Sequence, residues 1–244
     1  MTSLPKPEIG TTNVRYRLPA IHPEGYKYVA ISAAIALLFM VLISDEIGWL
    51  LVIVTIWVVT FFRDPIRTTP KDERMIVSPA DGLVTMIEDV PVPRELAGED
   101  ALGSGTLTRV SVFMSVFDVH INRTPIGGVI RRVVYVSGKF LNADLDKASE
   151  ENERQYILVE GPTGVRVGFT QIAGLVARRI LSFVKPGDII APGQRVGLIR
   201  FGSRVDVFLP QGVAPRVILG QRCIAGETIL GELGNAHRMS GISQ

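Results

Sequence analysis

Residues 184–199 read VKPGDIIAPGQRVGLI, and residues 217–233 read VILGQRCIAGETILGEL. The second stretch repeats the first at an offset of 33 residues, so that Gly187 matches Gly220 and Gly193 matches Gly226. Each copy contains an apolar run, a tight glycine turn and a second apolar run, which is the pattern of two strands joined by a turn. The repeat therefore predicts a compact β domain.

The chain before the repeat has the same β character. Short β-branched runs bounded by Gly, Pro and Asp extend back to residue 75, and EGPTGV at 160–165 is typical of a hairpin turn. Residues 173–182 (AGLVARRILS) are expected to form a helix. With the turn in SPADG at 78–82, the repeat indicates a mainly β barrel-sandwich similar to lipoyl and biotinyl domains. That fold carries many functions, and no lysine stands at a hairpin apex as a biotin or lipoate carrier requires.

Two apolar runs without charge lie near the N-terminus, at 29–44 (VAISAAIALLFMVLIS) and 47–62 (IGWLLVIVTIWVVTFF), with Asp45 and Glu46 between them. As a helix each run would be about 24 Å long, against a hydrocarbon core of roughly 30 Å. One continuous helix would place two acids in mid-membrane, which is costly. We therefore expect a membrane-associated helical hairpin over residues 26–63. A buried soluble hairpin and a hairpin embedded in one leaflet are the alternatives.

Basic residues flank both sides of this hairpin, and its turn has none. By the positive-inside rule both ends are expected at the cytoplasmic face of the cell membrane. The expected organisation is a cytoplasmic tail (1–25), the membrane hairpin (26–63) and a β domain (64–244) held at the lipid surface. The flanking bases are Arg15, Arg17 and Lys27 before the first apolar run, and Arg63, Arg67, Lys71 and Arg74 after the second.

Composition excludes several classes of partner. The net charge is +2, from 26 Lys and Arg against 24 Asp and Glu, so no nucleic-acid partner is expected. A single cysteine, Cys223, excludes an internal disulfide and a multi-cysteine metal site. The three histidines, at 22, 120 and 237, have no zinc-binding spacing, so no metal is expected.

Three positions could carry chemistry. Gly202 and Ser203 interrupt the strand sequence IRFGSRVDVFLP, and a serine after glycine can attack the preceding carbonyl because glycine has no Cβ to hinder it. His120 in FDVHINRTP suits proton transfer near neutral pH, and Asp118 is expected on the same strand face. Asp81 in SPADG lies at a turn. The ordinary alternatives are a glycine turn, a hydrogen-bonded strand-end histidine and an Asx turn.

The chain carries three motifs in this order behind an apolar segment: SPADG, FDVHINRTPIGGVI and RFGSRVDVFLP. In combination they resemble the short bacterial form of phosphatidylserine decarboxylase, over about residues 10–235. The resemblance implies self-cleavage between Gly202 and Ser203 into a β chain (1–202) and an α chain (203–244). It implies that Ser203 becomes a pyruvoyl group, a covalent cofactor that forms a Schiff base with phosphatidylserine and yields phosphatidylethanolamine. The implied partners are this lipid, the membrane and the two chains of one precursor. The oligomeric state is open, a homodimer included.

The resemblance is incomplete at one position. Longer members of the family carry a D-x-H-x-x-H pattern, in which His120 matches the first histidine but Arg123 replaces the second. Asp81 matches the aspartate of the self-cleavage triad. The processing base is therefore open between His120 acting in both steps, Asp81 acting with little help, and His237; we favour His120 with Asp81. Candidates for pairing with the lipid phosphate are Arg123, Arg131 and Arg132.

Three rival functions remain at this stage. A non-enzymatic, membrane-anchored adaptor with a lipoyl-like fold would stay one intact chain of 26.6 kDa. A pyruvoyl decarboxylase of a soluble amino acid would not need the apolar hairpin. A membrane-bound serine hydrolase is disfavoured because the sequence around Ser203, FGSR, lacks the G-x-S-x-G elbow.

Overall fold

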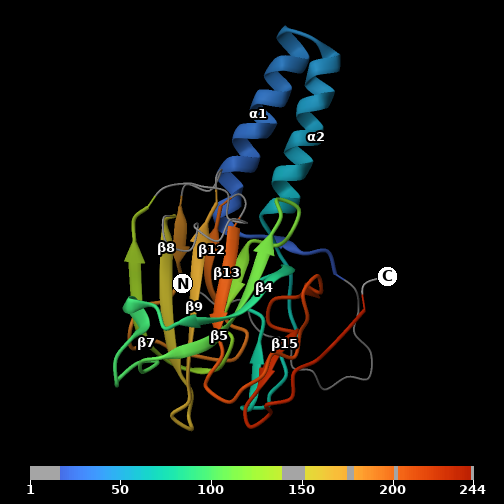
Figure 1. The fold of residues 1–244 in the computed structure, drawn as a ribbon. Helices are drawn as coiled ribbons and strands as arrows, with labels where there is room; N and C mark the ends of the chain where they lie inside the picture. The colour runs from blue at the N-terminus through green and yellow to red at the C-terminus, as the bar shows by residue number, and fades with distance from the viewer. Residues whose placement is uncertain (1–16, 139–151, 175–178, 201–202, 243–244) are drawn as a thin grey trace.

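The computed structural model describes residues 17–138, 152–174, 179–200 and 203–242. A helical hairpin projects from a β domain (Figure 1). The hairpin contains α1 (Tyr26–Leu42) and α2 (Asp45–Phe61), and a short helix, η1 (Pro23–Gly25), leads into it. The two helices predicted from the apolar runs are confirmed. Among the described residues, one helical run, Pro23–Leu42, is long and apolar enough to cross a membrane.

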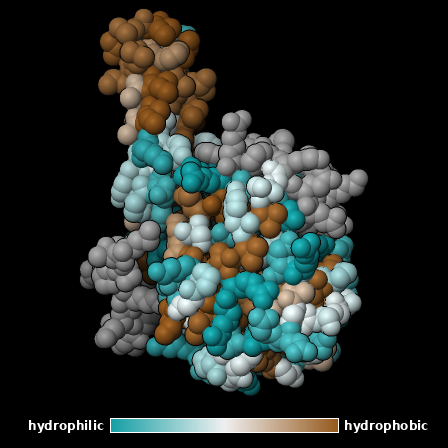
Figure 2. Space-filling view, turned by 90° about the vertical axis from the view of Figure 1, so that its left-hand side faces the viewer, coloured by the Kyte–Doolittle hydropathy of each residue, from teal (hydrophilic) through white to brown (hydrophobic). Residues whose placement is uncertain are grey.

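The hairpin presents apolar side chains to its surroundings on all sides. Leu38, Leu50 and Ile53 are 51%, 60% and 63% exposed, although each lies in the middle of a helix. In Figure 2 the hairpin is a hydrophobic column that stands clear of a largely hydrophilic body. A core helix of a soluble domain would bury such residues, so the exposed column needs an apolar environment outside the chain.

The β domain is built around one curled antiparallel sheet of eight strands (Figure 1). In spatial order the strands are β11 (Ile189–Ile190), β7 (Gly128–Val136), β8 (Arg154–Glu160), β9 (Arg166–Ala173), β13 (Ser203–Phe208), β5 (Thr106–Met114), β4 (Gly82–Pro91) and β14 (Arg222–Cys223). All residues of the central strand β13 are buried, and so are all but the first of its neighbour β9, because side chains of both faces are covered.

Smaller sheets close the domain around this large one. One prediction is wrong here: residues Ile180–Ser182, expected to end a helix, form a strand that pairs with Arg195–Ile199, and residues 175–178 lie outside the described part. The apolar run pairs with the strand Arg195–Ile199, and this partner cannot be identified from the residues of the run itself. The remaining elements are β10 (Ile180–Ser182), β12 (Arg195–Ile199) and β6 (Ile121–Arg123) in one sheet, β15 (Ile229–Glu232) with β3 (Met75–Val77), β1 (Ala20–Ile21) with β2 (Arg63–Asp64), and the short helix η2 (Arg94–Leu96).

The mainly β fold and the internal repeat are confirmed. The first copy places β11 against β7, where Ile189 faces Val129, and the second places β14 against β4, where Arg222 faces Leu83. The turn glycines Gly193 and Gly226 have φ of 67° and 78°, which explains why glycine stands at both positions. The hairpin at 160–165 joins β8 to β9, as predicted.

The foot of the helical hairpin is fixed to the β domain by an apolar cluster. Phe61 and Phe62 at the end of α2 are 1% and 0% exposed and pack with Ile121 of β6 and Leu198 of β12. The ring of Tyr28 in α1 stacks on Phe62, with centroids 5.2 Å apart. The foot of the hairpin, meaning Phe61, Phe62 and Tyr28, is therefore closely packed against strands β6 and β12.

Candidate active site

Ser203 is the first residue of the central strand β13. It lies between Met114 of β5 and Ala173 of β9 in the ladder, and it is fully buried. Its hydroxyl donates to Met114 Sδ at 3.3 Å, and a thioether is a weak acceptor. The hydroxyl is therefore held in place without a strong competitor for its proton. Gly202, the other half of the predicted cleavage site, lies outside the described residues.

A chain of buried amides leads to the same thioether. Asn122 Nδ2 donates to Met114 Sδ at 3.5 Å, and Asn122 Oδ1 accepts from Gln171 Nε2 at 2.7 Å. Gln171 Oε1 in turn accepts from Gln155 Nε2 at 2.9 Å. These amides fix Asn122 two residues from His120, so Met114 links Ser203 to the histidine segment.

His120 lies just before β6 and is fully buried. Its Nδ1 is 3.0 Å from the carbonyl oxygen of Asp118. A carbonyl only accepts, so Nδ1 carries the proton and the lone pair of the neutral ring lies on Nε2, which is the form of a base. Burial lowers the pKa of His120 to about 4. The hydrogen bond to the Asp118 carbonyl and the charge of the Asp118 carboxylate oppose this shift. The imidazole is therefore neutral near neutral pH.

The expectation that Asp118 and His120 share one strand face is wrong. Residues 115–120 form a turn and loop, and strand β6 begins only at Ile121. The Asp118 carboxylate caps this turn by accepting from the backbone N–H and the hydroxyl of Ser115 at 2.9 Å and 2.7 Å, and it also pairs with Arg222. Asp118 thus shapes the loop, and its backbone carbonyl orients the His120 ring.

Asp81 lies where β4 begins, beside the end of β5. Its Oδ2 is 2.5 Å from the Arg67 guanidinium, and its Oδ1 accepts from the backbone N–H of Ala225 at 2.7 Å. Burial raises the pKa of Asp81, and the attraction of Arg67 opposes this effect. The charge of Asp118 acts on Asp81 as well, so the two carboxylates lie within electrostatic range of one another.

Arg123, the residue in place of the second histidine, anchors the chain. Its guanidinium donates to the carbonyl oxygens of Gly193 at 2.8 Å and Pro65 at 2.9 Å, and it lies 3.8 Å from Asp64. It is only 6% exposed. These contacts tie the segment after α2 to the first copy of the repeat and occupy the guanidinium that was a candidate for the lipid phosphate.

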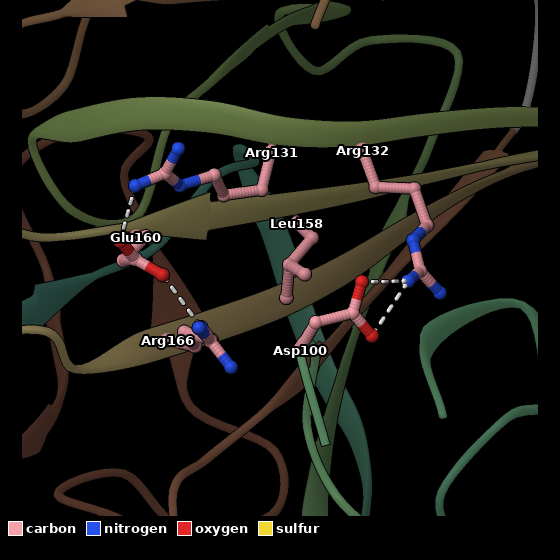
Figure 3. Close-up of a pocket in the computed structure, with 6 residues that line it drawn as sticks. All are labelled: Asp100, Arg131, Arg132, Leu158, Glu160 and Arg166. Carbon is pink, nitrogen blue, oxygen red and sulfur yellow. Dashed lines mark hydrogen bonds and ion pairs between the residues drawn. The ribbon is translucent and has the colours of Figure 1, made fainter. Parts of the chain in front are cut away.

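The other candidate arginines line a separate cavity of about 280 Å³, next to Leu158 of β8 (Figure 3). Arg131 lies 2.5 Å from Glu160, which also pairs with Arg166, and Arg132 lies 3.2 Å from Asp100. Two carboxylates and three guanidinium groups therefore face one another there, and neither Arg131 nor Arg132 is brought to Ser203.

His237, the third candidate base, lies in an exposed C-terminal segment. The side chain of its neighbour Arg238 is 3.3 Å from Asp89, which is eight residues along β4 from Asp81. At about 3.4 Å per residue this separation is about 27 Å. The structure therefore brings Ser203, His120 and Asp81 to the end of β5 and leaves His237 at the opposite end of β4.

Three further residues shape this site, and sequence reasoning missed two of them, Met114 and Phe61. Met114 and Asn122 connect Ser203 with the histidine segment, and Phe61 packs its ring on His120 with centroids 4.2 Å apart. Only Asn122 had a local signal, since it lies two residues after His120. The others reach the site from β5 and α2, through long-range packing.

Comparisons with known proteins identify the family of this chain. The family model described as phosphatidylserine decarboxylase matches residues 54–231. Proteins named phosphatidylserine decarboxylase proenzyme are 62% identical in Novosphingobium aromaticivorans and 60% identical in Erythrobacter litoralis, covering 93% of this chain and 92% and 93% of those proteins. One from Zymomonas mobilis is 56% identical over 91% of each chain. The chain therefore belongs to the phosphatidylserine decarboxylase family, a family of enzymes.

Proposed function

We propose that this chain is a self-cleaving, pyruvoyl-dependent decarboxylase that converts phosphatidylserine to phosphatidylethanolamine at a membrane surface. The observation that carries the proposal is the placement of Ser203: a fully buried hydroxyl at the start of a central strand, with the His120 segment and Asp81 at the same end of β5. Family membership argues against the non-enzymatic adaptor alternative.

Processing begins at the Gly202–Ser203 peptide bond. Ser203 Oγ attacks the Gly202 carbonyl carbon, a C–O bond forms, and the C–N bond breaks to give an ester. Removal of the serine α-proton then expels the Gly202 carboxylate by β-elimination. Addition of water to the resulting dehydroalanine and loss of ammonia leave a pyruvoyl group on the α chain. The weak Ser203–Met114 hydrogen bond leaves the hydroxyl able to react.

His120 is the proposed base, acting with Asp81. The hydrogen bond to the Asp118 carbonyl leaves the lone pair of the neutral imidazole on Nε2. Asp118 places negative charge near the ring, which stabilises the imidazolium formed when it takes a proton. The Arg67 guanidinium favours the charged form of Asp81 and so opposes the rise in its pKa that burial causes.

The buried surroundings of Ser203 fit a pyruvoyl group. The ladder contacts with Met114 and Ala173 hold this position on both sides, and the neighbouring side chains are a thioether and a buried amide. By Schiff-base chemistry the ketone supplies an electrophile for the amine of the lipid headgroup and an electron sink when CO2 departs. The chain's own residues exclude water from this position and hold the imidazole that moves protons.

The hairpin gives this site access to a lipid substrate. Its exposed apolar column matches a hydrocarbon environment, and α2 ends at Phe61, whose ring contacts His120. A substrate with two acyl chains stays in the bilayer, so a site at the foot of the hairpin meets its headgroup. We propose that the hairpin holds the domain at the cytoplasmic face of the cell membrane, as its flanking bases indicate.

Intact mass under denaturing conditions tests the cleavage. The purified wild type should give a 42-residue α chain (203–244) with a blocked, ketone-bearing N-terminus, and a β chain of residues 1–202. Ser203→Ala should stay uncut and release no CO2 from phosphatidylserine vesicles. Ser111→Ala, which changes another fully buried strand serine, is the matched control and should cleave. An uncut Ser203→Ala variant with full activity would refute the mechanism.

A further inference from the structure

We infer that the end of α2 is a working part of the active site, with Phe61 acting as a positioning residue for His120. The hairpin would then do more than hold the chain at the bilayer. This inference rests on the proposed role of His120 and extends it to a residue of the apolar hairpin.

The first observation is the ring contact. Phe61 is the last residue of α2 and is 1% exposed. Its ring centroid lies 4.2 Å from that of His120, with an angle of 33° between the planes. Phe61 also meets Phe62 edge-on at 5.0 Å, which fixes its own orientation. The imidazole is therefore packed against a ring that the neighbouring aromatic holds still.

The second observation is a polar tie from the same place. Just beyond α2, Arg63 donates to the carbonyl oxygen of Thr60 at 2.6 Å and to that of Phe117 at 2.7 Å. Phe117 belongs to the turn that Asp118 caps, and the Asp118 carbonyl accepts from His120 Nδ1. The end of α2 thus packs against the imidazole ring through Phe61. Through Arg63 it also holds the turn that contains the Asp118 carbonyl, the hydrogen-bond partner of His120 Nδ1.

The electrostatic setting of His120 depends on the same contacts. Within the described part of the chain, the charged groups that act on the imidazole are Asp118 and Arg63. Asp118 pairs with Arg222 and lies within electrostatic range of Asp81. The apolar ring of Phe61 excludes water from the imidazole and disfavours its charged form. A smaller side chain there would admit water and raise the pKa of His120 towards its ordinary value of 6.5.

The test separates positioning from anchoring by using a substrate that needs no membrane. Detergent-solubilised, processed enzyme is assayed with dihexanoyl phosphatidylserine below its micelle concentration, over a pH series. Phe61→Leu keeps an apolar side chain but removes the ring, and Arg63→Gln cuts the polar tie at the surface. Ile53→Ala changes an exposed side chain in the middle of α2, about two turns before Phe61, and is the matched hairpin control.

We expect Phe61→Leu to lower kcat about 10-fold or more with little change in KM, since a positioned base contributes roughly 100-fold or more. The acid limb of the pH profile of kcat for this variant should move up by about one pH unit, because the pKa of His120 rises towards its ordinary value. Arg63→Gln should lower kcat about 3-fold. Ile53→Ala should match the wild type. Where a variant processes slowly, the first-order rate of self-cleavage and its pH dependence are measured instead.

One result would overturn the inference and leave anchoring as the sole role of the hairpin. In that result, Phe61→Leu and Arg63→Gln both keep the wild-type kcat and pH profile on the soluble lipid and lose activity only on vesicles. A change in Phe61→Leu alone would limit positioning to the ring contact and remove the polar tie. Failure of the wild type to cleave or to release CO2 would instead count against the proposed function.

Discussion

Acid should destabilise this fold through His120, and the size of the effect follows from its burial. The pKa of the buried imidazole is lowered from 6.5 to about 4, chiefly by desolvation. Between these values the unfolded chain binds a proton that the folded chain does not. The stability is therefore complete above the ordinary pKa and is lost as pH falls through this window. The gap corresponds to about 3 kcal/mol of unfolding free energy.

Denaturant unfolding followed by circular dichroism measures this loss. Both proteins compared should carry Ser203→Ala, so that each is a single uncut chain, and one should also carry His120→Gln. Between about pH 7 and about pH 4.5, the protein with His120 should lose about 2 kcal/mol more than the protein without it. Asp81, whose burial raises its pKa, contributes with the opposite sign, but equally in both proteins. Equal losses would show that His120 is not buried in a dry site and would refute the argument.

Three further predictions concern the surroundings of the site. Gly82→Ala should lower the thermal midpoint by several degrees in a melting experiment, because a Cβ there would overlap the carbonyl oxygen of Phe113. Phe117→Ser should weaken binding to vesicles in a sedimentation assay and leave turnover of a soluble short-chain lipid unchanged, because this ring is 71% exposed beside the foot of the hairpin. Arg131→Ala should leave decarboxylation unchanged in a CO2-release assay, because this side chain pairs with Glu160 away from Ser203; a large loss would place the headgroup in that cavity.

Much of the fold was predictable because its signals are local. The two apolar runs became α1 and α2, and the 33-residue repeat became the equivalent pairings of β11 with β7 and of β14 with β4. The failure at Ile180–Ser182 has the opposite cause. A short apolar run fits a helix or a strand equally well, and its partner, β12, decides the outcome through long-range pairing.

The candidate site divides in the same way. Ser203, His120 and Asp81 could be selected because each lies in a short motif with a chemical reason for its residue type. The role of Arg123 could not be read, because its partners are carbonyl oxygens of Gly193 and Pro65, far away in the sequence. The contact of Phe61 with His120 could not be predicted for the same reason, since an aromatic residue at the end of an apolar helix has no local feature that marks contact with a histidine.

The position of Ser203 also explains how a chain could cut itself without coming apart. The proposed break falls immediately before β13, and all six residues of this strand, Ser203–Phe208, are buried and paired with both β5 and β9. Strands β14 and β15 of the same segment pair with β4 and β3. An α chain beginning at an edge strand would have ladder contacts on one side only and could peel away. Here the N-terminus that the proposed cleavage creates would be held from both sides, so the ketone would stay where the hydroxyl was placed.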